Sequence, residues 1–192
     1  MDSITTLKKK DTPNMSHFDW EDPFRLYDQL SEDERLIMMS ARTFANQMLK
    51  PRAIKSFREE ISEPDLFKEL GEAGLLGINI PEEYGGLGSS YVTYGLAARE
   101  IERIDSGYRS MMSVQSSLVM YPIYVYGSET QRKKYLPKLA TGNLIGCFGL
   151  TEASAGSDPA GMRSVAKKIP NGYQISGSKM WISNSPFADI FI

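Results

Sequence analysis

Residues 141–150 read Thr141-Gly142-Asn143-Leu144-Ile145-Gly146-Cys147-Phe148-Gly149-Leu150, and here the pattern of the chain changes. Before this stretch, apolar residues recur at helical spacing. After it come short apolar or alternating runs separated by turn signals, which are typical of strands. The sequence therefore predicts an α+β protein with a flexible extension over 1–17, an all-helical unit over 18–141, and a β unit over 142–192.

The β unit is expected to be antiparallel and incomplete. Asn171-Gly172 between alternating residues is a strong hairpin signal. Only four or five candidate strands are present, which is too few for a closed barrel and would leave open strand edges. The chain is therefore expected to be cut within a barrel-like domain. The expected strands are 144–150, 163–169, 173–176, 179–183 and 189–192.

The helical unit is defined by start and stop signals. Ser31 and Ser128 each precede an S-x-x-E/Q capping-box pattern. Leu36, Ile37, Phe44 and Met48 are expected on the buried face of the first helix, which Pro51 should end or kink. Further helices are expected near 63–73, with Gly74 in the left-handed position after it, and over 90–105, 109–122 and 128–139.

Composition excludes several classes of function. Apolar residues make up 41% and charged residues 24%, and the net charge is −2. A near-neutral chain does not favour nucleic acid as a partner, and no apolar run approaches the about 20 residues that span a bilayer. The only histidine is His17 and the only cysteine is Cys147. A histidine triad, a multi-histidine metal site and an internal disulfide are therefore all excluded.

Two polar stretches could hold a ligand. Thr151–Pro159 follows a predicted strand and offers hydroxyl and backbone N–H donors, as a diphosphate or a ring carbonyl requires. Lys179–Asn184 places the indole of Trp181 two residues from the Ser183 hydroxyl, which suits a flat heterocycle. A surface turn and a core tryptophan are the simpler interpretations of the two stretches taken singly. The glycine order in Pro81–Gly88 fits no phosphate-binding motif, so a structural turn is expected there.

The segment Asp105–Ser110 joins two predicted helices and contains Arg109. An arginine near buried surface needs an anion, because an unpaired buried charge is costly. Glu102, seven residues earlier, could serve as an internal partner. A carboxylate ligand held by the guanidinium is the alternative.

Together these stretches resemble the acyl-CoA dehydrogenase family. Gly149–Asp158 and Lys179–Asn184 resemble its two signature stretches, Pro81–Gly88 its early loop, and Gly127–Pro137 its fourth-helix region. Asp105–Met120 looks like the glutaryl-CoA dehydrogenase subfamily, as does Phe18–Pro23. The resemblance covers nearly the whole chain, with Ala153 in place of a usual proline and Ser183 in place of a usual threonine.

The resemblance implies a fold, a cofactor and a reaction. A carboxy-terminal four-helix domain, which would carry the catalytic glutamate, is absent from this sequence, so no catalytic residue is expected here. FAD would accept hydride from the β carbon of glutaryl-CoA while the glutamate removes the α proton. Decarboxylation to crotonyl-CoA and electron transfer to electron-transfer flavoprotein would follow, as in lysine and tryptophan degradation. FAD contacts are implied for Phe148, Gly149, Leu150, Thr151, Glu152, Gly156, Ser157, Trp181, Ile182 and Ser183.

Substrate contacts are implied for Arg109, Ser110 and Ser157, with Arg109 receiving the free carboxylate of the glutaryl group. The family also implies a homotetramer for the complete enzyme. The extension lacks an arginine-rich leader, which favours a bacterial cytoplasm over a mitochondrial matrix. Two alternatives stay open: a dehydrogenase for another acyl-CoA, and a catalytically dead fragment that acts as an interaction module.

Overall fold

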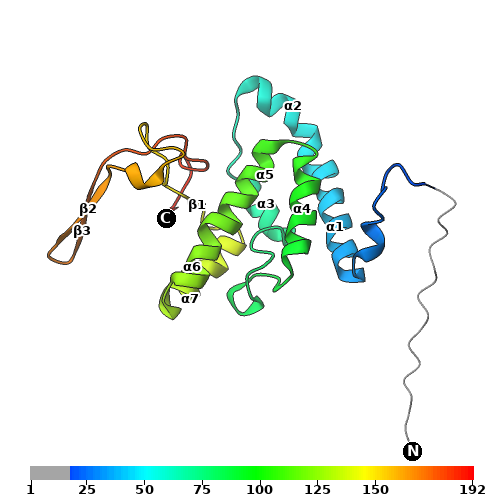
Figure 1. The fold of residues 1–192 in the computed structure, drawn as a ribbon, viewed down its shortest axis with the longest axis horizontal. Coiled ribbons are helices and arrows are strands. Elements are labelled where there is room, and N and C mark those ends of the chain that lie inside the picture. The colour runs from blue at the N-terminus through cyan, green and yellow to red at the C-terminus, as the bar shows by residue number, and fades with distance from the viewer. Residues whose placement is uncertain (1–17) are drawn as a thin grey trace, which may run out of the picture.

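The computed structural model describes residues 18–192, so the extension predicted for 1–17 lies outside the described residues. A helical unit leads into a small β unit at its side (Figure 1). Within residues 18–192, no helix has the length and apolar character needed to cross a bilayer. The α-helices are α1 Glu32–Phe44, α2 Lys50–Glu59, α3 Leu66–Glu72, α4 Tyr91–Glu102, α5 Ser106–Ser113, α6 Tyr121–Tyr126 and α7 Glu129–Ala140.

The predicted helix starts are confirmed by their caps. Ser31 and Ser128 each form a full capping box, in which the hydroxyl accepts from the third helical N–H and that residue's side chain accepts from the cap. The Ser90 hydroxyl caps α4 by accepting from the Thr93 N–H. Gly74 follows α3 at φ +69°, the left-handed conformation expected after its end.

Pro51, Pro122 and Pro137 lie within continuous helical runs, so of the two outcomes predicted for Pro51, an end or a kink, the end is wrong. A π-helical segment, Ala45–Leu49, precedes Pro51, and another, Val114–Met120, precedes Pro122. In each case the residue before the proline donates its N–H five residues back. A wider turn accommodates the missing N–H and the ring of proline without stopping the helix.

The buried face of the first helix differs from the prediction. Leu36 is 67% exposed and Met48 is also exposed, whereas Met38, Ala41, Ala45 and Leu49 are buried. The small alanine side chains let α1 approach α4 closely, so the contact is made by residues with little apolar bulk. Ile37 and Phe44 are half-buried and Phe44 packs against the core, so the predicted face overlaps the buried face only in part.

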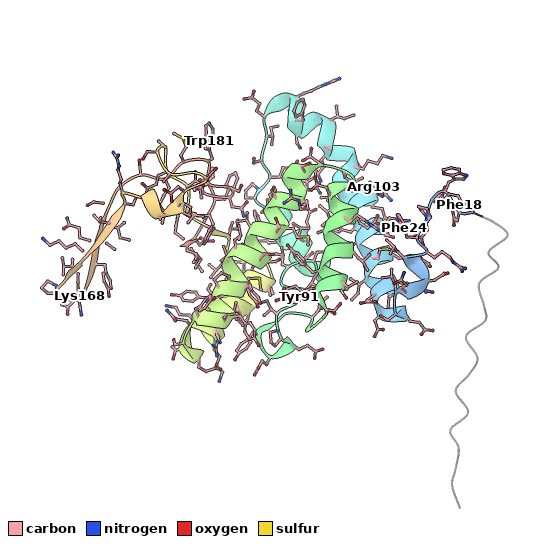
Figure 2. The ribbon with its side chains drawn as sticks, viewed as in Figure 1. Phe18, Phe24, Tyr91, Arg103, Lys168 and Trp181 are labelled. Carbon is pink, nitrogen blue, oxygen red and sulfur yellow. The ribbon has the colours of Figure 1, made fainter. Side chains whose placement is uncertain are left out.

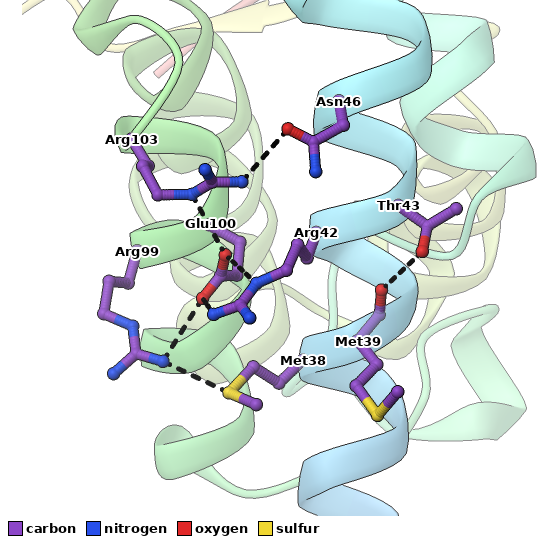
Figure 3. Close-up of polar contacts among 8 residues, drawn as sticks. All are labelled: Met38, Met39, Arg42, Thr43, Asn46, Arg99, Glu100 and Arg103. Atoms are coloured by element: carbon purple, nitrogen blue, oxygen red, sulfur yellow. Dashed lines mark hydrogen bonds and ion pairs between the residues drawn. The ribbon is translucent and has the colours of Figure 1, made fainter. Parts of the chain in front are cut away.

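One buried carboxylate fixes α1 to α4. Glu100, whose side chain is 2% exposed, accepts from Arg42 Nε at 2.9 Å and Nη2 at 3.1 Å, and Arg99 and Arg103 also contact it (Figure 3). Burial acts to raise the pKa of Glu100, but the hydrogen bonds and charges of Arg42 and Arg99 leave that pKa below its usual value. The cluster locks the register of the two helices.

The β unit contains two separate two-stranded sheets. The hairpin of β2 Val165–Ile169 and β3 Gly172–Ser176 is antiparallel, as predicted, with Pro170-Asn171 as its loop. β1 Gly146–Cys147 and β4 Ile190–Phe191 pair in parallel, which departs from the antiparallel prediction. Residues 179–183 form no strand, because the chain turns at Trp181, where φ is +59°. A helical unit followed by a small β unit is nevertheless what the sequence predicted.

The Gln115 side chain joins the two units. Its Nε2 donates to the carbonyl oxygens of Leu139 at 3.0 Å and Leu144 at 2.7 Å, and its Oε1 accepts from the Gly146 N–H at 2.8 Å. The residue is fully buried in the π-helical segment before α6. A Cβ on Gly146 would lie 2.4 Å from the Val119 side chain, so the strand approaches this helix as closely as glycine allows.

Replacing Gln115 with leucine should lower the free energy of unfolding by about 2–4 kcal/mol, because three backbone groups each lose a hydrogen bond at a buried or half-buried site. Chemical denaturation followed by far-UV circular dichroism measures this change. Gln47→Leu, at an exposed position of the other π-helical segment, is the matched control. Equal effects of the two substitutions would contradict the role assigned to Gln115.

Candidate functional site

The structure brings the two polar signature stretches into contact. The Met180 N–H donates to the Thr151 carbonyl at 2.9 Å, and Lys179 Nζ donates to the Leu150 carbonyl at 3.0 Å. These bonds place Trp181 next to the Thr151–Pro159 loop, although 30 residues separate the two in sequence. The two predictions for this region therefore describe one surface.

Glu152 is a structural anchor within that surface. Its carboxylate accepts from Lys179 Nζ at 2.9 Å and from the backbone N–H groups of Arg163 at 2.7 Å and Ser164 at 3.0 Å. The Lys179 ammonium, followed by these backbone donors, lowers the pKa of Glu152 to about 2. The carboxylate is turned inward and shapes the loop, while the FAD contact implied for Glu152 stays a prediction.

Apart from the buried Ala155, the rest of the loop is exposed or half-buried. Ser154, Gly156 and Ser157 are exposed, and Thr151 is half-buried. Asp158 accepts from the Ala160 N–H at 3.1 Å and so closes the short 3-10 helix Pro159–Gly161. The loop thus offers hydroxyl and backbone donors to an anionic or carbonyl-bearing group.

The half-buried run Phe148–Leu150 lies between β1 and this loop. The Gly149 N–H donates to the Ile192 carbonyl at 2.8 Å, next to the β1–β4 pair. The run therefore connects the β1–β4 pair to the start of the Thr151–Pro159 loop.

Trp181 presents its indole to solvent. The side chain is 86% exposed, and Figure 2 shows it at the outer edge of the β unit. Its φ of +59° is uncommon for a bulky residue, and such strained backbone clusters at ligand-binding positions. The simpler interpretation of a core tryptophan is therefore wrong. Ile182 beside it is half-buried and Ser183 is exposed.

A cleft of about 440 Å³ lies where the two units meet. Tyr108 and Ser110 of α5 line one side, and Ser183 and Phe187 of the turn after Trp181 line the other. Phe57 at the end of α2 contributes an apolar wall. The structure thus brings the predicted residues Ser110 and Ser183 to the same cleft. Of the described residues that line it, none is Ser157 or Arg109.

Arg109 is paired within the protein. Its guanidinium binds the Glu102 carboxylate through Nε and donates to the Ser113 hydroxyl from Nη1 at 3.1 Å. The arginine side chain is 36% exposed. The hydrogen bond from Ser106, together with that from Arg109, lowers the pKa of Glu102. The internal partner proposed for Arg109 from sequence is confirmed, and its role toward a ligand carboxylate stays a prediction.

A polar network beneath the cleft was missed by sequence reasoning. The Tyr108 hydroxyl donates to Ser56 at 3.3 Å, and the Ser56 hydroxyl contacts Glu63 at 3.4 Å. Arg52 then bridges Glu63 and Glu69, at 3.1 and 3.0 Å. These residues come from three helices and a loop, so their spacing in sequence carries no signal of the contact.

Comparison with known families follows the two units. Residues 31–143 match the family profile described as acyl-CoA dehydrogenase, N-terminal domain, and residues 147–192 match that described as acyl-CoA dehydrogenase, middle domain. An acyl-CoA dehydrogenase of Bacillus subtilis is 37% identical over 85% of this chain and 43% of its own length. The mitochondrial isovaleryl-CoA dehydrogenase of Pongo abelii is 36% identical over 85% of this chain and 39% of its own length.

Solved structures give the same result. The glutaryl-CoA dehydrogenase of Mycobacterium smegmatis, in complex with FADH2, superposes with a TM-score of 0.84 at 45% sequence identity. The match covers 88% of this chain and 43% of that protein. The chain therefore spans about two fifths of the length of the relatives it matches.

Stabilisation by Glu152 should depend on pH. Because its pKa is lowered to about 2 by folding, the stabilisation is complete above the ordinary value of 4.5 and is lost as pH falls toward 2. Glu152→Gln should therefore lower the melting temperature at pH 7. The difference in melting temperature between this variant and the unsubstituted chain should shrink as pH falls from 4.5 to 2.5. Thermal unfolding measured across this range, with the exposed Glu83→Gln as control, tests this. A pH-independent difference would contradict it.

Proposed function

The chain belongs to the acyl-CoA dehydrogenase family, and from this premise we propose that it is the FAD- and substrate-binding portion of a glutaryl-CoA dehydrogenase. One observation carries the proposal. The hydrogen bond between Met180 and Thr151 joins an exposed indole and an exposed donor loop into one surface, beside a cleft lined by hydroxyls.

The surface fits a flavin dinucleotide. The indole of Trp181 and the side chain of Ile182 would cover the flat ring system, and the exposed Ser183 hydroxyl would donate to its polar edge. Thr151, with the exposed Gly156 and Ser157 of the same loop, would donate to the diphosphate. When bound, FAD supplies the acceptor for the hydride that leaves the β carbon of the substrate.

Ser110 and Arg109 would hold the acyl group. Ser110 lines the cleft, and Arg109 lies next to it in α5, with its guanidinium one-third exposed. The terminal carboxylate of a glutaryl group would be recognised by this guanidinium, whose planar donors suit a carboxylate. Glu102 would then share the arginine with the ligand.

The carboxylates that line the cleft are already engaged. Glu63 is held by Arg52, and Asp105 caps α5 by accepting from the Gly107 N–H at 2.7 Å. We therefore assign removal of the α proton to a glutamate outside residues 1–192.

Decarboxylation to crotonyl-CoA, transfer of electrons to electron-transfer flavoprotein, and a homotetramer belong to the same proposal for the whole enzyme. A bacterial cytoplasm, or a mitochondrial matrix in a eukaryote, would be its location.

A second candidate is a dehydrogenase for an uncharged acyl-CoA. Because Glu102 already neutralises Arg109, the pair needs no anionic ligand to be stable. Relatives named for branched substrates, such as isovaleryl-CoA dehydrogenase, are 36% identical to this chain. The two candidates differ in what Arg109 does during turnover.

Replacing Trp181 with serine should weaken FAD binding by about tenfold, because the flavin loses its stacking partner. Equilibrium dialysis of FAD against the enzyme completed to the length of its relatives measures the change. Trp20→Ser is the matched control, since Trp20 is 85% exposed and lies in the helical unit. No FAD binding by the unsubstituted enzyme would favour an interaction module over a dehydrogenase.

Arg109→Gln in the completed enzyme should lower kcat/KM for glutaryl-CoA by at least about tenfold, the loss expected for one charge-assisted interaction. Turnover of butyryl-CoA should change little or rise, since a straight-chain substrate carries no carboxylate. Steady-state kinetics with both thioesters measure the two values. Unchanged glutaryl-CoA turnover would rule out the carboxylate-binding role and favour the uncharged substrate.

A further inference from the structure

The Lys179 side chain makes a three-point contact beneath the proposed flavin surface. Its Nζ lies 3.0 Å from the Leu150 carbonyl, 2.9 Å from Glu152 Oε1 and 3.2 Å from Met162 Sδ. An ammonium group has three N–H donors, so every donor has an acceptor. Each acceptor comes from a different stretch: the run before the loop, the loop itself, and the segment before the hairpin.

A second contact fixes the chain on the other side of the indole. Asn184 donates from Nδ2 to the Gly146 carbonyl at 3.2 Å and is 9% exposed. Its φ is +68°, so a second left-handed residue follows Trp181 at a distance of three positions. Side-chain hydrogen bonds therefore attach the segment 179–184 at its two ends, whereas Trp181 between them is exposed.

The exposed indole lies between these two contacts. With 86% of its surface open, Trp181 receives little packing that could set its direction. Its left-handed backbone is held against its own preference by the flanking contacts. The position of the backbone from which the indole extends therefore depends on how firmly residues 179 and 184 are attached.

We propose that Lys179 and Glu152 are positioning residues that hold the donor loop and Trp181 in one fixed arrangement before FAD binds. That this arrangement serves FAD binding rests on the proposed function, whereas the arrangement itself can be tested without FAD. Glu152 orders the loop through two backbone N–H groups and meets Lys179 at its remaining lone pairs. Lysine suits the site because its donors point in three directions, whereas the donors of an arginine lie in one plane.

Hydrogen exchange in the 192-residue chain tests the arrangement without flavin. Lys179→Met should raise the exchange rate of the Met180 amide, which donates to Thr151, by about tenfold, the loss expected for one charged hydrogen bond. Lys168→Met, at an exposed residue of the hairpin (Figure 2), is the control and should leave this exchange rate unchanged.

Two further variants separate positioning from general stability. Glu152→Gln should reproduce the effect of Lys179→Met, and the double variant should add little to either alone, because both substitutions remove the contact that Lys179 and Glu152 share. Lys179→Arg, which keeps the charge, should restore part of the protection. Unchanged exchange at Met180, or equal loss of protection in the hairpin 165–176, would overturn the proposal.

FAD affinity then tests the purpose of the arrangement. In the enzyme completed to the length of its relatives, Lys179→Met should weaken binding of FAD several-fold relative to Lys168→Met, because the indole and the loop must be ordered during binding. Equal affinities of these two variants would overturn the positioning role. Failure of the unsubstituted completed enzyme to bind FAD would count against the proposed function, while the exchange rates alone would still decide whether Lys179 and Glu152 order the surface.

Discussion

The buried amide of Gln115 is the constraint on which the rest of the arrangement depends. A single side chain contacts the backbone at the end of α7, at the turn that follows, and at the first strand. Hydrogen bonds of this kind fix direction as well as distance. Once β1 is placed, β4 is placed by pairing with it, and the turn of residues 183–187 comes to lie against α2 and α5. The cleft between the units is a consequence of that attachment.

The two units are stabilised in different ways. Apolar side chains from α1, α3, α4 and α5 form one core, and those of α6 and α7 form a second. Apolar burial is non-directional and fills space. The β unit instead depends on polar side chains bound to backbone, chiefly Glu152, Lys179 and Asn184. Such contacts can hold an exposed, strained residue such as Trp181 where apolar packing would have buried it.

Several carboxylates of the protein have a structural role. Glu100, Glu102 and Glu152 have lowered pKa values because each carboxylate is bound by cations or backbone donors. Carboxylates held in this way order the structure but have little basicity left for proton transfer. The surface that remains available for a ligand is made of hydroxyls, backbone amides, an indole and one partly exposed guanidinium. Such groups are suited to binding and orienting a ligand.

The sequence alone determined the features that depend on neighbours in the chain. Capping residues at Ser31 and Ser128, the turn at 170–171 and the change of period near residue 142 act over a few positions, so their signals are local. The signature stretches likewise indicated the family. Only the tertiary structure decided which face of α1 is buried, that Pro51 and Pro122 lie within helical runs, and that residues 179–183 turn instead of forming a strand. It also decided between the two partners that the sequence offered for Arg109, and it decided that Glu152 faces inward, because Lys179, Arg163 and Ser164 are brought to Glu152 by folding.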